Sequence, residues 1–262
     1  LRTKEQQSAH VNTCAAPPKG ESVRQVFRAR PWVLPPEPAK LAELFRDGHV
    51  VTLDAGATFR HGGTEGYVAL LLEGLVTFSF LDIRGNYHTF ALVLPGRTIG
   101  DLDALNPNRT SVIAECIRPS RALLIPNSQY RRGLRTSTEL MEMYADMSIL
   151  KEESIIEGAF ANFTLDTDRR LRVLLLSFFL EGGGQISANE WNECPVSLSV
   201  TEISRIIAAT RSWVSTRLSE WQREGILKKT GRTFAVRTEL FESVKDWLPP
   251  IKTPEPISIE IP

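Results

Sequence analysis

A basic, hydroxyl-rich stretch near the C-terminus carries the side chains best suited to bind another molecule. Between Ser199 and Arg237, eight Arg and Lys residues stand against three Glu, in a chain whose formal net charge is zero. Within this stretch, polar residues at helical spacing lie on a different side of the helix from the apolar residues. These polar residues are Arg211, Ser212, Ser215, Thr216 and Ser219. Guanidinium, ammonium and hydroxyl groups donate hydrogen bonds to phosphate oxygens and base edges, so the pattern indicates a surface for nucleic acid.

Two short helices joined by a tight turn must position these groups. One helix has three apolar residues on one face, and the next has apolar residues at steps of four and three. They are Ile203, Ile206, Ile207, Val214, Leu218 and Trp221. The hydroxyl of Thr210 is suited to cap the second helix. Two β-prone runs, 226–229 and 233–237, flank a Thr-Gly turn signal, so we predict a winged helix-turn-helix. Any amphipathic helix pair shares this spacing, however.

Composition and length describe an ordinary globular chain. The 262 residues are 42% hydrophobic and 24% charged, enough for one large or two ordinary domains. The longest apolar stretch, Leu171 to Leu180, is interrupted by Arg172 and Ser177 and is too short to span a membrane. The first twenty residues lack the apolar core of a signal peptide. We therefore expect a cytoplasmic protein without a membrane segment.

The cysteines argue for the same compartment. Cys14, Cys116 and Cys194 are odd in number, scattered and not at metal-ligand spacing. A reducing environment therefore fits better than a disulfide framework or a zinc finger.

The middle of the chain changes to β character. From about Val50 to Ile125, short runs rich in Val, Leu, Thr, Phe and Tyr alternate with glycine-bearing turns. Many short strands with regular turns predict a roll or jelly roll. The expected fold class is therefore α+β. We divide it into a flexible arm (1–30), a β-roll (31–133), a long helix (134–163), a winged helix-turn-helix (164–241) and a tail (242–262).

The long helix carries a repeat of its own. Leu140, Met143, Met147 and Leu150 follow steps of three, four and three, a spacing typical of a coiled-coil seam. The pattern predicts a dimerisation helix. A helix buried against its own domain explains the spacing equally well.

Over roughly residues 40–240, this order of elements resembles the CRP/FNR family of bacterial transcription regulators. Gly56, Gly74 and Pro95-Gly96 stand at the spacing of the family's roll glycines. Ile99-Gly100-Asp101-Leu102, followed by Arg109-Thr110-Ser111, is similar to its phosphate-binding cassette. Glu202-Ile203 through Ile226-Leu227 aligns without a gap with its helix-turn-helix. The resemblance implies a homodimer, not an enzyme, that binds a two-fold symmetric site in double-stranded DNA and contacts RNA polymerase.

The resemblance also implies roles for single residues. Arg211 matches the recognition-helix Arg that contacts guanine, whereas Ser212 and Thr216 replace a frequent Glu and a usual Arg, which puts the familiar half-site in doubt. Arg217 stands in a normally apolar slot and is expected to reach a phosphate, and Ala208 replaces the turn glycine. The predicted DNA contacts are Thr201, Thr210, Arg211, Ser212, Ser215, Thr216, Arg217, Lys229 and Arg232.

The implied effector site is the cassette. Its residues are Gly100, Asp101, Leu102, Arg109, Thr110 and Ser111. Asp101 is a methylene shorter than the Glu that holds the ribose in cyclic-nucleotide-binding members, while Arg109 suits an anion. Three alternatives stay open: a cyclic nucleotide, another small molecule, or no ligand, with Arg109 paired to Asp101 or Asp103.

Other sensor chemistries have their own residue requirements. An iron–sulfur cluster needs several N-terminal cysteines, and only Cys14 lies there, so we expect none. Haem needs an axial ligand, for which His49, His61 and His88 are the candidates. A thiol switch between Cys14 and Cys194 is a further hypothesis.

Two other classes of protein remain as alternatives to a DNA-binding regulator. One is a cupin-like β-roll metalloenzyme, which needs clustered His and Glu ligands that the sequence does not show as a pair or motif. The other is a ligand-sensing module that does not bind DNA.

Overall fold

The structure is a computed structural model that describes residues 27–59, 66–106, 112–182, 191–195, 197–230 and 233–249. Its first part contains two four-stranded antiparallel sheets, in the orders β1-β8-β3-β6 and β2-β7-β4-β5, which is the strand order of a jelly roll. The strands are β1 His49–Leu53, β2 Thr58–Phe59, β3 Tyr67–Glu73, β4 Val76–Leu81, β5 Tyr87–Val93, β6 Thr98–Ile99, β7 Ile113–Cys116 and β8 Ser120–Pro126. Alternating side chains from both sheets fill the space between them, including Leu71 and Val76, which are fully buried.

Helices cover one side of this roll. They are α1 Ala39–Ala42 with the 3₁₀ turn η1 Glu43–Phe45, α2 Asp101–Leu105, α3 Asn127–Leu134 and α4 Thr138–Thr164. The side chain of Ser137 caps α4 by accepting a hydrogen bond from the Leu140 N–H at 3.4 Å. The long helix therefore begins after the start at 134 that the sequence predicts, because Leu134 ends α3.

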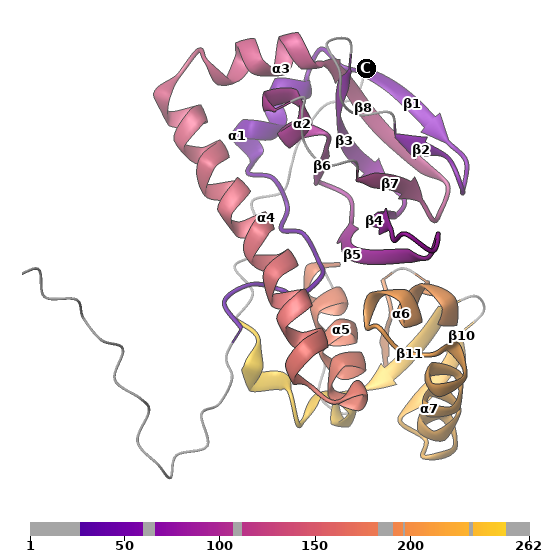
Figure 1. Ribbon diagram of the computed structural model, residues 1–262. Coiled ribbons are helices and arrows are strands. Elements are labelled where there is room, and N and C mark those ends of the chain that lie inside the picture. The colour runs from indigo at the N-terminus through magenta and orange to yellow at the C-terminus, as the bar shows by residue number, and fades with distance from the viewer. Residues whose placement is uncertain are drawn as a thin grey trace, which may run out of the picture.

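The second part contains α5 Thr167–Glu181, α6 Val200–Ile206 and α7 Arg211–Arg223, with a three-stranded antiparallel sheet in the order β10-β11-β9. Its strands are β9 Trp191–Glu193, β10 Leu227–Thr230 and β11 Thr233–Arg237, and two 3₁₀ turns follow, η2 Thr238–Phe241 and η3 Lys245–Trp247. Figure 1 shows the roll at one end, α6 and α7 at the other, and α4 running along the side between them. Among the described residues, no helix is long and apolar enough to cross a membrane.

One hydrophobic core connects the two parts. Trp32 and Leu92, from the roll side, belong to the same buried cluster as Leu171, Ile203 and Trp221 of the helical side. The α+β class predicted from the sequence is confirmed by this architecture.

Both described ends of the chain differ from the expected arm and tail. Phe27 and Val244 are 2% and 0% exposed, and the Phe27 N–H donates to the Trp247 carbonyl at 2.7 Å. Phe27, Val244 and Leu248 thus belong to the core that connects the two parts, so packed structure begins before residue 31 and continues beyond residue 241. The short apolar runs there have no period, so sequence pattern alone does not reveal them.

Candidate nucleic-acid interface and ligand site

The α6–α7 pair is a tightly capped helix-turn-helix. Ser199 and Glu202 form a reciprocal capping box at the start of α6. The turn passes through Ala208, whose φ is +50°. As the sequence predicts, the Thr210 hydroxyl caps α7, accepting from the Trp213 N–H at 3.2 Å. These contacts fix the direction in which α7 leaves the turn.

One face of α7 is buried and the opposite face is exposed. Val214 and Trp221 are fully buried and Leu218 is half-buried against the core. The predicted contacts Thr210, Arg211, Ser212, Ser215 and Thr216 are all exposed, and Ser219, Gln222 and Arg223 extend the same outer surface. Ser219 belongs to the polar face predicted from the sequence but not to its predicted DNA contacts, and Gln222 and Arg223 belong to neither. Steps of three and four from Ser212 and Ser215 are the signal that places them there.

A hollow of about 280 Å³ lies between α7 and the β10–β11 strands. On the helix side it is lined by Ser215, Ser219 and Gln222, and on the strand side by Lys229 and Thr233. The hydroxyls of Ser219 and Thr233 donate to backbone carbonyls of the chain. The hydroxyl of Ser215, the amide of Gln222 and the ammonium of Lys229 are further hydrogen-bond donors in the lining, which also includes apolar residues such as Leu218 and Phe234. No described residue forms an ion pair with Lys229, Arg211 or Arg223, so this part of the surface presents unneutralised positive charge.

Arg217 lies elsewhere. Its guanidinium faces α5, where Nε donates to Asp168. Its Nη1 donates to Glu220 of α7 at 2.9 Å. Burial alone raises the pKa of Asp168, but the hydrogen bonds from Arg172 and Arg217 outweigh it and lower that pKa. Two of the five N–H donors of Arg217 are thus used within the chain, so the predicted phosphate contact of Arg217 stays a prediction that depends on the remaining donors. Thr201 is half-buried in the first turn of α6, and Arg232 lies outside the described residues.

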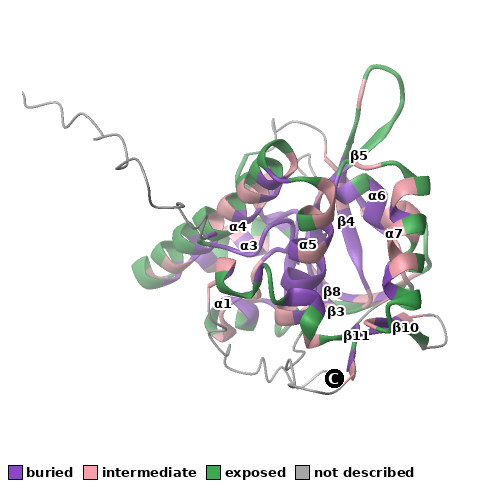
Figure 2. Ribbon diagram, turned by 90° about the horizontal axis from the view of Figure 1, so that it is seen from below, coloured by how far each residue is buried: buried purple, intermediate pink, exposed green. Residues whose placement is uncertain are grey.

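An ion pair and a cation–π contact connect the helix-turn-helix to the roll. Arg118, between β7 and β8, forms a two-pronged pair with Glu202 of α6, at 2.8 and 2.9 Å. Arg205 lies over the ring of Tyr87, 5.3 Å from its centroid. Figure 2 shows the β4–β5 hairpin, which contains Tyr87, extending beside α6 with an exposed tip. The position of α6 is thus coupled to the roll at two places.

The predicted cassette contains a buried cluster of charges. Gly100, at φ +83°, precedes α2, and Asp101 behind it is 4% exposed. Lys151 of α4 donates from Nζ to Asp101 at 2.8 Å and to the Thr98 hydroxyl at 2.7 Å, and also pairs with Glu37. Burial opposes the charge on Lys151, but the two carboxylates prevail and raise its pKa. The carboxylate that the resemblance assigns to an effector therefore binds the chain's own ammonium group.

Little space remains beside this cluster. Gly100, Asp101 and Leu102 line a hollow of about 70 Å³, whereas pockets for drug-sized ligands measure about 300–1,000 Å³. The rings of Phe78 and Phe90, with centroids 6.3 Å apart, occupy its other side. Arg109, Thr110 and Ser111 of the predicted site lie outside the described residues. Lys151 and Glu37 are not predicted from the sequence, because only the fold brings them to Asp101.

The apolar residues of α4 divide between two faces. Leu140, Met143 and Met147 pack against the roll's helical layer, in the core of their own domain. The predicted dimerisation seam therefore corresponds to an internal contact for these three residues. A second stripe points outward: Ile149, Ile156, Phe160 and Phe163 are 57%, 62%, 46% and 89% exposed. Leu150, 40% exposed, lies off this stripe.

The residues considered for haem and thiol chemistry are dispersed. His49 packs edge-on against Tyr67, and His88 contacts Asp82 at 3.0 Å. His61 and Cys14 are outside the described residues, while Cys194 is 4% exposed. Within the described ranges, no three His, Cys, Asp or Glu residues are grouped to hold a metal ion.

Comparison with known proteins identifies the fold. No protein-family profile matches the chain, and no curated protein does. Among solved structures, FixK2 from Bradyrhizobium japonicum is 18% identical with a TM-score of 0.62, covering 74% of this chain and 95% of its own. A CRP/FNR-family transcriptional regulator from Thermus thermophilus is 19% identical with a TM-score of 0.56, covering 72% and 93%. The c-di-GMP responsive global regulator CLP from Xanthomonas campestris is 17% identical with a TM-score of 0.58, covering 76% and 99%. The chain therefore has the fold of CRP/FNR-family transcription regulators.

Proposed function

We propose that this chain is a sequence-specific DNA-binding transcription regulator that acts as a homodimer. The observation that carries the proposal is the outer face of α7, where cations and hydroxyls stand exposed on a helix anchored by Val214 and Trp221. The fold likeness to transcription regulators supports this function over a cupin-like enzyme or a module that does not bind DNA.

The geometry of α7 suits the major groove. The major groove is about 12 Å wide and admits an α-helix, and the N-terminal residues of such a helix contact base edges. Arg211 is the first residue of α7, and its guanidinium can donate two hydrogen bonds to one guanine. The hydroxyls of Ser212, Ser215 and Thr216 can donate to bases or phosphates, while Lys229 at the neighbouring hollow is placed to neutralise a phosphate.

The outward stripe of α4 is the proposed dimer contact. Four large apolar side chains exposed along one face of a 27-residue helix are unusual unless another molecule covers them. A second copy related by a two-fold axis provides the matching stripe. Such a dimer presents two α7 helices to successive major grooves about 34 Å apart.

The proposal also includes effector sensing by the roll. It further includes RNA polymerase as a partner and a cytoplasmic location. CLP is described as c-di-GMP responsive, which supports a sensing role for the roll in this fold. Ligand binding would act by shifting the population between two arrangements of α4 and the helix-turn-helix.

Site selection from randomised duplex DNA with the purified protein, at two salt concentrations, tests the proposal. We expect a two-fold symmetric sequence with half-sites about one helical turn apart, and an affinity that falls steeply with salt. Recovery of no preferred sequence, with and without cell extract as a source of effector, would rule out a sequence-specific regulator.

A further inference from the structure

Among the described residues, the chain's own side chains fill most of the predicted effector site between the roll and α4. Lys151 forms ion pairs with both Asp101 and Glu37 there, and the phenyl rings of Phe78 and Phe90 adjoin the remaining hollow of about 70 Å³. A small molecule of nucleotide size does not fit this space as it stands. The described part of the roll contains a second hollow with different chemistry.

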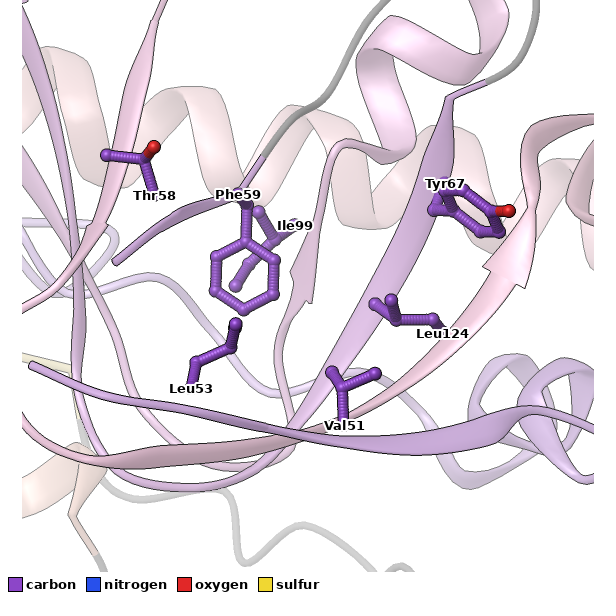
Figure 3. Close-up of a pocket in the computed structure, with 7 residues that line it drawn as sticks. All are labelled: Val51, Leu53, Thr58, Phe59, Tyr67, Ile99 and Leu124. Atoms are coloured by element: carbon purple, nitrogen blue, oxygen red, sulfur yellow. The ribbon is translucent and has the colours of Figure 1, made fainter. Parts of the chain in front are cut away.

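This second hollow lies between strands of the roll and is almost entirely apolar. Its volume is about 180 Å³, and it is lined by Val51, Leu53, Thr58, Phe59, Tyr67, Ile99 and Leu124. Figure 3 shows Leu53, Phe59 and Ile99 gathered at one end, with Val51, Leu124 and Tyr67 at the other. Among the described lining residues, the only polar side-chain atoms are the hydroxyls of Thr58 and Tyr67, which lie at the periphery.

The exposure of the lining shows that the roll is incompletely filled here. Val51, Leu53, Phe59 and Leu124 pack against the roll core, yet each remains half-buried. Core positions of a well-packed roll are fully buried, as Leu71 is. The inward-facing apolar groups around the hollow therefore lack packing partners on one side.

We infer that this roll cavity binds a small, uncharged, apolar molecule of about the size of a benzene ring. Enclosed apolar cavities of about 150 Å³ lined by Leu, Ile and Phe bind benzene. This hollow has a similar volume and lining but opens to solvent beside the exposed residues Thr58 and Tyr67. None of the described lining side chains is charged, so a charge placed among them would be desolvated without compensation.

Strand β6 can transmit a displacement from this cavity to α4. Ile99 forms part of the cavity wall, while its neighbour Thr98 hydrogen-bonds with Glu37 and Lys151 in the charged cluster. Successive side chains of a strand point to opposite sides, so displacement of Ile99 by a ligand moves Thr98 against α4. A regulatory role for the cavity rests on the proposed function, whereas ligand binding itself does not.

The test uses fluorobenzene as the probe. Its binding to the full chain, in the absence of DNA, is measured by fluorine NMR. We expect saturable binding by the wild type, competition by benzene and no competition by cyclic AMP. Val51→Phe fills the cavity and should abolish binding. Thr52→Phe is the matched control, since Thr52 is the exposed neighbour on the same strand, and it should bind as the wild type does.

Two results would overturn the inference: no saturable binding by the wild type, or equal binding by the Val51→Phe variant in its folded form. If Val51→Phe does not fold, nuclear Overhauser contacts from benzene to the methyl groups of Leu53, Ile99 and Leu124 in the wild type decide the location, and their absence contradicts it. DNA affinity is measured separately with and without fluorobenzene, so that failure to bind DNA leaves the cavity result intact.

Discussion

At the scale of single residues, Lys151 has the most consequential contacts. Its ammonium group is buried between two carboxylates that come from the segment before α1 and from the start of α2. A buried ion pair contributes little net stability compared with apolar residues, but removing one partner leaves uncompensated charge. Lys151 therefore fixes α4 to the roll more than it stabilises the fold as a whole.

Replacing Lys151 with Met should destabilise the protein by about 3–5 kcal/mol, because Asp101 and Glu37 are left buried without their ion-pair partner. Urea unfolding at neutral pH measures the change. Adding Asp101→Asn and Glu37→Gln to the same chain removes the stranded charges and should restore part of the loss. A Lys151→Met variant as stable as the wild type would contradict this account of the cluster.

At Ala208, unlike at Lys151, a substitution should stabilise the protein. Its φ of +50° lies in the left-handed region that glycine adopts without strain. Ala208→Gly should therefore stabilise the protein by about 1 kcal/mol. The neighbouring Ala209→Gly is the control, since Ala209 has no positive φ and its replacement should destabilise. Equal shifts of the thermal midpoint for both variants would show that strain at Ala208 is not relieved.

At the scale of elements, α4 presents two apolar faces with different tasks. The spacing of Leu140, Met143 and Met147 predicts an apolar seam correctly, but cannot say which molecule covers it. The structure assigns these residues to the internal core and leaves Ile156 and Phe163 on the other face exposed. Sequence pattern gives the period of a helix, whereas its rotation relative to the roll depends on tertiary packing.

Ile156→Glu should therefore shift the protein from dimer to monomer in sedimentation velocity, because it places a charge in the centre of the exposed stripe. Leu150→Glu makes the same chemical change on the same helix, off the stripe, and should leave the dimer intact. The reverse pattern, with Leu150→Glu monomeric and Ile156→Glu dimeric, would return the interface to the seam predicted from the sequence.

The contact of α6 with the roll gives a pH-dependent prediction. Burial alone raises the pKa of Glu202, but the hydrogen bonds from Arg118 and Ser199 outweigh it and hold the pKa below its usual 4.5. A lowered native pKa adds stability that is present above the unfolded value and is lost as pH falls through the native one.

Glu202→Gln should thus cost about 1 kcal/mol at neutral pH, and this difference from the wild type should shrink between about pH 5 and pH 3. Urea titrations across that range measure it. A difference that stays constant with pH would mean that the charge of Glu202 does not contribute.

At the scale of the whole molecule, element order is far easier to predict than the contacts between distant segments. Glycine turns, apolar periods and the cap at Thr210 are local signals, and they predict the α+β fold and the helix-turn-helix. The charged cluster joins Glu37, Asp101 and Lys151, which are widely separated in sequence. The capture of Arg217 by Asp168 likewise depends on the packing of α5 against α7. Such long-range pairings carry no local pattern.

The hydrophobic core shared by the two parts couples the helix-turn-helix to the roll. Because one buried cluster includes Trp32 and Leu92 as well as Ile203 and Trp221, the helix-turn-helix is not an independently tethered module. We expect a change at α4 or β6 to reach α7 through this core and through the Arg118–Glu202 pair, since packed interiors are rigid and transmit displacement.

The affinity of the protein for its selected duplex, compared between the wild type and Arg211→Ala by fluorescence anisotropy, tests the central claim most directly. Arg211→Ala should lose about 1–3 kcal/mol for the selected site and relax the preference for guanine at one position of each half-site. Arg169→Ala removes the same charge from an exposed position on α5 and should have little effect. Equal losses for the two variants, without any change in sequence preference, would contradict a role for α7 in reading DNA.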